Sequence, residues 1–203
     1  MTFINIIDPA EANADVLAMY DTELKGNGFL PSYAKVFCHR PKTMDLWADL
    51  HRGIREQLDR RLYELATVAA AVELKSTACS LAHGAKLARF YSADDVLAIA
   101  SGEEASAPGF SEQDVAVMAL ARKVARDAGS VEADDIQRLK ASGLTDGEVF
   151  DIVATAAGRA FFTKLVEGLG ALPDAEMAAV GLPLCEGMVV GKPIDGTYGS
   201  YQN

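Results

Sequence analysis

Cys79 and His83, four residues apart, are the strongest candidates for chemistry in this chain. On a helix this spacing puts both side chains on one face, about 40° apart around the axis, where thiol and imidazole can share a proton directly or through water. Such a pair favours a thiolate, the reactive form of cysteine. If Ser76 is the N-cap of that helix, Cys79 falls in the first turn, where the helix dipole and free N–H groups stabilise negative charge further. We therefore predict a nucleophilic Cys79 with His83 as its proton acceptor.

Glu64 lies upstream, directly before eight uncharged residues at 65–72. Only Thr67 interrupts the apolar character of that run, so its helix should be buried on nearly every side. A carboxylate there needs a partner, and His83 is a natural one, because a nucleophile, a base and an orienting group form an activated triad. Taken singly, Cys79 is equally consistent with a small buried side chain, His83 with a structural or surface residue, and Glu64 with a solvated first-turn residue. Only their joint spacing indicates catalysis.

Two helices must position these residues, and we place the break between them at residues 73–76. The stretch 59–89 contains no proline and a single late glycine, and it is rich in Ala and Leu, the best helix formers. Lys75 suits a helix C-terminus and Ser76 suits an N-cap. One uninterrupted helix is the alternative.

Cap-like residues and helical periodicity predict helices along most of the remaining chain. Asp8 should cap a first helix that begins at Pro9 and stops near residues 26–28. A second helix is expected over residues 41–58. Its predicted buried stripe consists of Met44, Leu46, Trp47, Leu50 and Ile54. Further helices should follow four cap-like residues, Ser92, Ser111, Ser130 and Thr145.

The predicted fold is a single all-α domain, because no window outside the last twenty residues alternates apolar and polar residues convincingly. We divide it into an N-terminal helix within residues 1–28, a helical core at 29–182 and an irregular C-terminal arm at 183–203. The arm contains four glycines and two prolines, and we expect it to lie against another subunit. Together with the uniformly apolar run at 65–72, it predicts a homo-oligomer.

The motif residues resemble the signature of the alkylhydroperoxidase D-like family, which includes the carboxymuconolactone decarboxylases. In that signature a glutamate is followed twelve residues later by a cysteine position, here Ser76, then by Cys79 and His83. Segments 29–31, 40–41, 110–157 and 165–174 also look like those of its peroxidase-related members, so the resemblance spans roughly residues 25–180. It implies a compact helical fold, reduction of organic or hydrogen peroxides, catalytic roles for Glu64, Cys79 and His83, and subunits packed as dimers, trimers or hexamers.

Ser76 departs from the family pattern. The redox-active members cycle a Cys-x-x-Cys pair through a disulfide, whereas this chain has Ser76 at the first cysteine position and Ala78 where some members carry a further histidine. A lone Cys79 thiolate can still attack a peroxide and become a sulfenic acid. Its recovery then requires an external thiol, or Cys38 or Cys185 brought close by folding or by another subunit.

Loss of one cysteine leaves two other functions open. The family's decarboxylating members act on a lactone acid through acid–base residues and without the cysteine pair. The alternative is therefore a lyase that uses Glu64, Glu73 and His83, or a non-catalytic binding protein on the same fold.

Composition and charge exclude several other classes. The net charge of −10 opposes binding to nucleic acid and to anionic membrane surfaces. Three scattered cysteines argue against a disulfide scaffold and a cysteine-based zinc site, and at least one thiol should be free. Cys38, His39 and His51 lack partners at ligand spacing, so we interpret them as structural. With no visible secretory signal, we expect a cytoplasmic protein that acts on a small molecule without a metal or cofactor.

Overall fold

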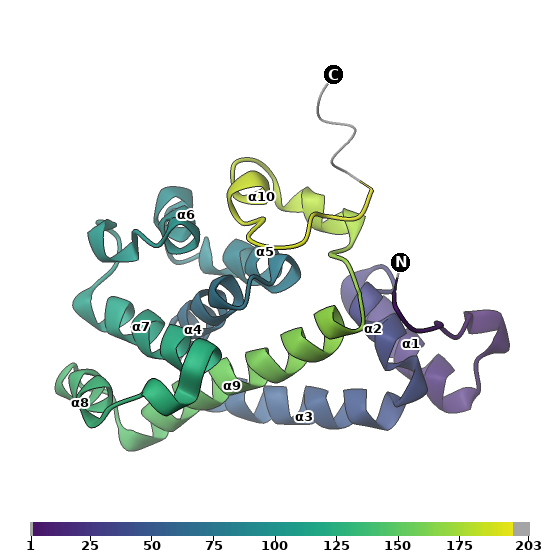
Figure 1. Cartoon of the computed structure of the whole chain (residues 1–203), viewed down its shortest axis with the longest axis horizontal. Coiled ribbons are helices and arrows are strands. Elements are labelled where there is room, and N and C mark those ends of the chain that lie inside the picture. The colour runs from purple at the N-terminus through teal and green to yellow at the C-terminus, as the bar shows by residue number, and fades with distance from the viewer. Residues whose placement is uncertain (1, 197–203) are drawn as a thin grey trace.

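The computed structural model of the chain describes residues 2–196 and folds them into helices without a β-strand (Figure 1). Its α-helices are α1 (Ala14–Asn27), α2 (Ser32–Val36), α3 (Pro41–Gln57), α4 (Arg60–Glu73), α5 (Thr77–Leu87), α6 (Ala93–Ser101), α7 (Glu112–Asp127), α8 (Ala133–Ala141), α9 (Asp146–Gly168) and α10 (Leu184–Gly187). The all-α prediction is therefore confirmed. Within the described part of the chain, no helix has the length and apolar character needed to cross a membrane.

The centre of the fold is α4, around which α5, α7 and α9 pack (Figure 1). Its residues 62–71 are all buried, as the apolar run predicts. Large side chains from three other helices cover it and have no exposed surface, among them Ile99, Met118 and Ile152. Each such side chain stabilises the fold by about 1.5–3 kcal/mol. Because one chain buries residues 62–71 of α4, the apolar run at 65–72 does not by itself require another subunit.

A second, smaller apolar cluster joins the N-terminal segment to α3, which lies alongside α9 (Figure 1). Its buried members are Val16, Met19, Tyr20, Phe37, Cys38, Met44 and Trp47. The predicted stripe of α3 is only partly buried: Met44 and Trp47 face this cluster, whereas Leu46 and Leu50 are each 58% exposed. The apolar residues of α3 are spread over a wider arc than the neighbouring helices cover.

Three of the four predicted internal caps are confirmed, since the side chains of Ser92, Ser111 and Thr145 each accept the backbone N–H three residues on. The fourth prediction is wrong. Ser130 ends a 3-10 turn, and α8 is instead capped by Glu132 in a reciprocal arrangement with Asp135. The carboxylate of Asp135, in the first turn of α8, accepts the N–H of Glu132 at 3.0 Å.

The first helix begins later than predicted. Asp8 accepts the N–H of Ala10 at 2.8 Å, but this cap starts only the single 3-10 turn Pro9–Glu11. Asn13 then caps α1, and the helix ends before Gly28, whose φ of 80° is the left-handed conformation that glycine adopts most readily. The second capping residue, Asn13, restarts the chain as an α-helix.

The break between α4 and α5 lies where the sequence places it. The N–H of Lys75 donates to the carbonyl of Val72 at 3.0 Å, and the N–H of Ser76 donates to that of Ala71 at 2.8 Å, which together form a Schellman motif. Lys75 adopts a left-handed φ of 56°, which a residue with a Cβ tolerates poorly. Ser76 directly precedes α5, although its hydroxyl accepts no capping hydrogen bond. This tight joint turns α5 back onto α4.

The described part of the C-terminal arm packs on α5 of its own chain (Figure 1). Met188 is completely buried, and its carbonyl accepts a hydrogen bond from the Ser80 hydroxyl at 2.5 Å. The N–H of Gly191 donates to Thr77 Oγ1 at 3.0 Å. Residues 183–196 therefore pack against their own chain, and their contact with another subunit stays a prediction. The late tyrosines of the predicted arm, Tyr198 and Tyr201, lie outside the described residues.

Gly191 offers a test of this packing, because a Cβ there would lie 1.8 Å from the carbonyl oxygen of Lys75. We predict that Gly191→Ala displaces the arm and lowers the free energy of unfolding by about 1–3 kcal/mol, the usual consequence of overpacking. Chemical denaturation measures this change. The matched control is Gly53→Ala on α3, where a Cβ has open space and alanine favours the helix by up to about 1 kcal/mol. Similar effects of the two substitutions would contradict the docked arm.

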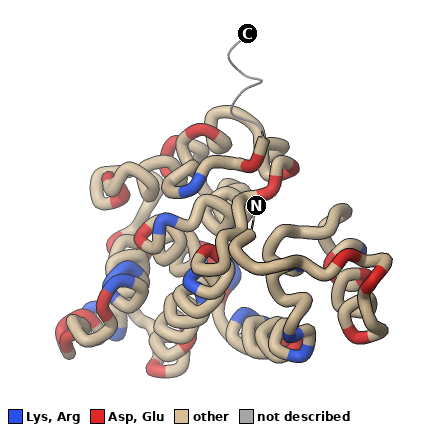
Figure 2. Tube along the Cα trace, turned by 45° about the vertical axis from the view of Figure 1, so that its right-hand side comes forward, with Lys and Arg blue, Asp and Glu red and all other residues tan. Residues whose placement is uncertain are grey.

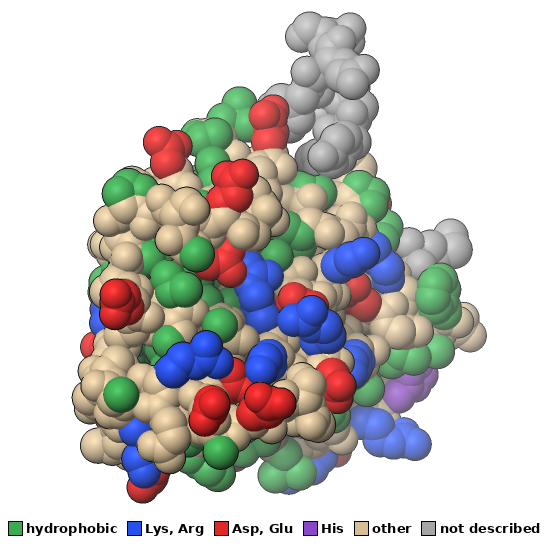
Figure 3. Space-filling view, turned by 60° about the vertical axis from the view of Figure 1, so that its left-hand side comes forward, with side chains coloured by type: hydrophobic (Ala, Val, Ile, Leu, Met, Phe, Trp, Pro, Cys, Tyr) green, Lys and Arg blue, Asp and Glu red, His purple; other side chains and the backbone are tan. Residues whose placement is uncertain are grey.

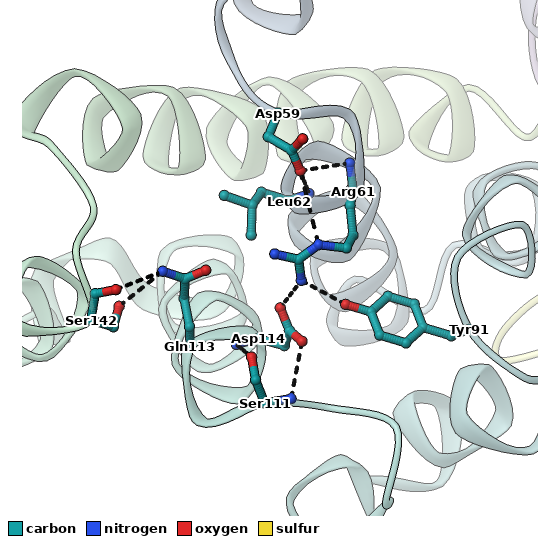
Figure 4. A network of polar contacts seen from close by, with 8 residues as sticks. All are labelled: Asp59, Arg61, Leu62, Tyr91, Ser111, Gln113, Asp114 and Ser142. Carbon is teal, nitrogen blue, oxygen red and sulfur yellow. Dashed lines mark hydrogen bonds and ion pairs between the residues drawn. The ribbon is translucent and has the colours of Figure 1, made fainter.

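A polar network ties the start of α4 to the start of α7 (Figure 4). The guanidinium of Arg61 contacts the carboxylate of Asp114 and donates to the Tyr91 hydroxyl at 2.7 Å. Asp114 also accepts the N–H of Ser111 at 3.0 Å. Burial alone raises the pKa of Asp114, but the hydrogen bonds from Ser111 and Arg61 outweigh it and hold that pKa below its usual value.

This depressed pKa predicts the sign of an acid effect. A carboxylate of this kind stabilises the fold above its ordinary pKa and loses that contribution as the pH falls through its lower folded-state value. We predict that Asp114→Asn lowers the unfolding free energy at pH 7 by about 1–3 kcal/mol and weakens the loss of stability below about pH 4. Denaturation at a series of pH values measures both, with Asp21→Asn on the exposed face of α1 as control. Parallel pH profiles for wild type and Asp114→Asn would refute this role.

Candidate active site

Glu64 and His83 are in direct contact in the interior of the fold. His83 Nδ1 lies 2.6 Å from Glu64 Oε2, and the other carboxylate oxygen lies 2.7 Å from a guanidinium nitrogen of Arg60. Glu64 has no exposed surface, and His83 is 7% exposed. The carboxylate is thus held from both sides, with the imidazole between it and the interior space described below.

The charges around His83 favour its neutral form. Burial lowers the pKa of His83 well below its ordinary value, and the positive charges of Arg159, Lys86 and Arg60 lower it further. A neutral imidazole that donates its Nδ1 proton to Glu64 keeps Nε2 as a hydrogen-bond acceptor. Burial raises the pKa of Glu64, while Lys86 and Arg60 act against that rise. The pair therefore offers a fixed, uncharged base.

A cavity of about 390 Å³ opens in front of His83, between α3, α5, α9 and the segment that connects α1 to α2. Helix α5 presents Cys79, His83 and Lys86 along one face of this cavity, as helical spacing dictates. Aromatic and other apolar side chains form the opposite walls: Phe29, Tyr33, Met44, Trp47 and Phe162. The predicted nucleophile and base therefore line one common space, with the predicted orienting carboxylate directly behind the base.

Arg159 is the residue that the sequence analysis missed. Its guanidinium is buried, lines the cavity and donates to the Tyr63 hydroxyl at 2.8 Å. Burial acts against its charge, but Tyr63 and Cys79 together hold the pKa of Arg159 above its ordinary value. A guanidinium next to Cys79 stabilises a thiolate. The sequence did offer one signal: Arg159 is the single charged residue between Asp151 and Lys164.

His51 was interpreted as structural, yet it also lines the cavity. It contacts the guanidinium of Arg159 and the Tyr63 hydroxyl. Burial, followed by the charge of Arg159, lowers the pKa of His51 to about 3, so this imidazole is neutral at physiological pH and can accept a hydrogen bond from the arginine. Its partners come from α4 and α9, far away in sequence, and no spacing within α3 reveals them.

Cys38 and Cys185, the proposed internal resolving thiols, do not line this cavity. Cys38 is buried in the N-terminal cluster and accepts the N–H of Ile7 at 3.4 Å, whereas Cys185 lies on α10. All three cysteines are unpaired.

Glu73, a member of the alternative lyase set, lies at the far end of α4 from Glu64. It forms ion pairs with Arg126 at 3.3 Å and Arg122 at 3.8 Å and does not line the cavity. The structure therefore does not bring it together with Glu64 and His83.

Ser76 lines a small separate cavity of about 30 Å³, and Cys79 also lines it. Its hydroxyl interacts with Glu167, whose pKa is raised by burial against the effect of that hydrogen bond. Residues 76 and 79 thus share one pocket at the start of α5. Among residues 2–196, no cluster of three or more His, Cys, Asp or Glu could hold a metal ion.

No family model and no curated protein matches the sequence. Solved structures do match. A peroxidase-related protein from Ralstonia eutropha JMP134, described as an alkylhydroperoxidase AhpD core, is 22% identical with a TM-score of 0.73 over 87% of this chain and 94% of its own. A peroxidase-related protein from Silicibacter sp. TM1040 is 17% identical with a TM-score of 0.74 over 87% and 93%. The debrominase Bmp8, solved with 2,3,4-tribromopyrrole, is 14% identical with a TM-score of 0.70 over 89% and 96%.

These similarities confirm the alkylhydroperoxidase D-like fold that the motif indicates. The sequence identities are low, between 14% and 22%, so the comparison shows that the helices are arranged in the same way and does not show a shared activity.

We predict that Arg159 controls the reactivity of Cys79, because its buried guanidinium lines the same cavity. Arg159→Met removes the adjacent positive charge, so alkylation of Cys79 by iodoacetamide at pH 7 should slow about tenfold, because the thiolate is the reacting form. Mass spectrometry of the peptide that contains Cys79 measures the rate separately from the other two cysteines. Arg159→Lys, which keeps the charge, should retain most of the rate, and Arg89→Met, an exposed site outside the cavity, should leave it unchanged. An unchanged rate in Arg159→Met would refute the assignment.

Proposed function

We propose that this protein reduces organic hydroperoxides or hydrogen peroxide with Cys79 as the nucleophile. The observation that carries the proposal is the convergence of three elements on one cavity: the Cys79 thiol, the buried Arg159 guanidinium and the His83 imidazole held by Glu64. The peroxidase-related names of two proteins with the same fold agree with it.

The chemistry needs no partner beyond the peroxide in its first step. His83 Nε2 takes the thiol proton while Arg159 stabilises the negative charge that remains on sulfur. The thiolate attacks the outer peroxide oxygen, an S–O bond forms as the O–O bond breaks, and the leaving alkoxide takes the proton from His83. A thiol and a hydroperoxide thus become a sulfenic acid and an alcohol. Because its surroundings lower the pKa of His83, the protonated imidazole is a strong acid toward the alkoxide.

An external thiol completes the cycle in this proposal, because no second cysteine lines the cavity. The first thiol displaces water from the sulfenic acid and forms a mixed disulfide. The second releases the Cys79 thiol and leaves as the oxidised disulfide. Three unpaired cysteines suit a reducing compartment, which supports the expected cytoplasmic location.

We predict that Cys79→Ser abolishes peroxide consumption in an assay coupled to dithiothreitol oxidation. His83→Gln should slow turnover about a hundredfold, as expected for loss of a general base and acid, and Glu64→Gln should slow it less because the carboxylate acts through His83. Cys185→Ser, away from the cavity, is the control that should retain activity. Full activity in Cys79→Ser would remove the basis of the proposal.

A gain of function tests the same site from the other side. Ser76 and Cys79 share a pocket, so Ser76→Cys should supply a resolving thiol, allow an internal disulfide and raise turnover with a dithiol reductant. Thr77→Cys, at the next position, is the matched control and should not raise it. A Ser76→Cys variant that gains neither activity nor a peroxide-induced disulfide would contradict the proposed geometry.

The lyase alternative now involves only Glu64 and His83, since Glu73 lies elsewhere. It requires turnover of a lactone acid that survives Cys79→Ser, which separates it from the thiol mechanism. A non-catalytic binding protein would show neither activity.

Self-association remains a prediction, now supported by Leu46 and Leu50, the exposed apolar residues of α3. Light scattering at micromolar concentration should give a mass that is a multiple of the 21.6 kDa chain. The mass of a single chain would contradict it.

A further inference from the structure

The cavity is rich in positive charge although the chain as a whole carries a net charge of −10. Four basic side chains line it, Arg52, Arg55, Lys86 and Arg159, against a single carboxylate, that of Glu23. Elsewhere acidic and basic residues are interleaved, both along the helices (Figure 2) and on the outer face shown in Figure 3. The excess of positive charge in the cavity is therefore a local feature of the site.

Three of these four cations have no carboxylate partner. Ion pairs among residues 2–196 include Arg52 with Asp49 but none of Arg55, Lys86 or Arg159. Burial lowers the pKa of Lys86, and the charge of Glu64, which acts against that fall, does not cancel it. A thiolate at Cys79 can balance Arg159, but neither Lys86 nor Arg55 forms an ion pair with a carboxylate of the described residues.

The positions of these groups set the shape of a ligand. Lys86 follows Cys79 by seven residues on α5, which separates them by about 10 Å along the helix axis. Apolar side chains border the space, and the rings of Trp47 and Phe162 lie with centroids 5.5 Å apart. An aromatic or other apolar body fits against this wall, with one end at Cys79 and the other at Lys86.

We propose that the substrate is a hydroperoxide with an apolar, ring-containing body and a carboxylate, in which Lys86 and Arg55 bind the carboxylate while the peroxide reaches Cys79. This inference rests on the proposed peroxidase function for the reacting end of the molecule. The anion site itself is independent of turnover, since it depends only on the aromatic wall and on two cations, Lys86 and Arg55, that form no ion pair with the described residues.

Binding can be measured without catalysis, because Trp47 is the single tryptophan of the chain and lines the cavity. In the Cys79→Ser variant, fluorescence titration compares 3-phenylpropanoate with 3-phenylpropan-1-ol, which has the same body without the charge. The carboxylate should bind at least about tenfold more tightly, the usual gain for a hydrogen bond to a charged group. Equal affinities would overturn the inference.

Variants locate the charge recognition. Lys86→Met and Arg55→Met, each made in the Cys79→Ser background, should reduce the preference for the carboxylate severalfold, and two separate sites guard against one variant that fails to fold. Lys164→Met, an exposed change of equal charge on α9 outside the cavity, should leave the preference intact. An equal loss in Lys164→Met would mean a general charge effect and would overturn the site.

Turnover measurements distinguish a failure of the proposed substrate class from a failure of the proposed peroxidase function. With active enzyme, cumene hydroperoxide and its ring-carboxylated analogue should differ in KM, with the lower value for the carboxylated compound. Turnover of both with equal KM would overturn the substrate class while the peroxidase stands. A carboxylate preference in binding with turnover of neither compound would overturn the peroxidase and support the anion site.

Discussion

The buried carboxylate of Glu64 is the constraint on which the rest of the site depends. A charged group with no access to water is costly unless it is paired, and here Arg60 holds one oxygen and His83 the other. The hydrogen bond between His83 Nδ1 and Glu64 Oε2 fixes the imidazole and leaves its other nitrogen, Nε2, free at the cavity that His83 lines. The buried part of α4, residues 62–71, can therefore carry one acidic residue, Glu64, among mostly apolar neighbours, because both carboxylate oxygens have a positively charged or hydrogen-bonding neighbour.

In a simple Cys–His pair, the histidine both accepts the thiol proton and supplies the positive charge beside the thiolate. In this site the two roles are divided between His83 and Arg159. Burial and three nearby cations lower the pKa of His83, so an imidazolium is not the lasting counter-charge for a thiolate. The Arg159 guanidinium supplies that positive charge permanently, and His51 and Tyr63 hold it in place. In the proposed reaction, His83 is then free to carry a proton. The fixed cation and the proton carrier come from different helices, Arg159 from α9 and His83 from α5, and both of these helices pack on α4.

Local signals in the sequence predict many of the helices and their ends. They do not predict contacts between segments that are distant in sequence. The apolar run at 65–72, the break at Ser76 and the spacing of Cys79 and His83 depend on neighbouring residues, so propensity and periodicity reveal them. Arg159 enters the site only because α9 packs on α4, and no rule of spacing connects it to Cys79. The burial of Met188 is also a product of tertiary contact, because the glycine-rich arm has no periodicity of its own.

In the proposed mechanism the sulfur of Cys79 is the reacting atom. Trapping its oxidised form, the sulfenic acid, tests this role directly. One equivalent of hydroperoxide is added to the reduced protein in the presence of dimedone, which labels sulfenic acids, and each cysteine peptide is analysed by mass spectrometry. We expect rapid labelling confined to Cys79, about tenfold slower in Arg159→Met and about a hundredfold slower in His83→Gln. Labelling at Cys38 or Cys185 with an unmodified Cys79 would contradict it.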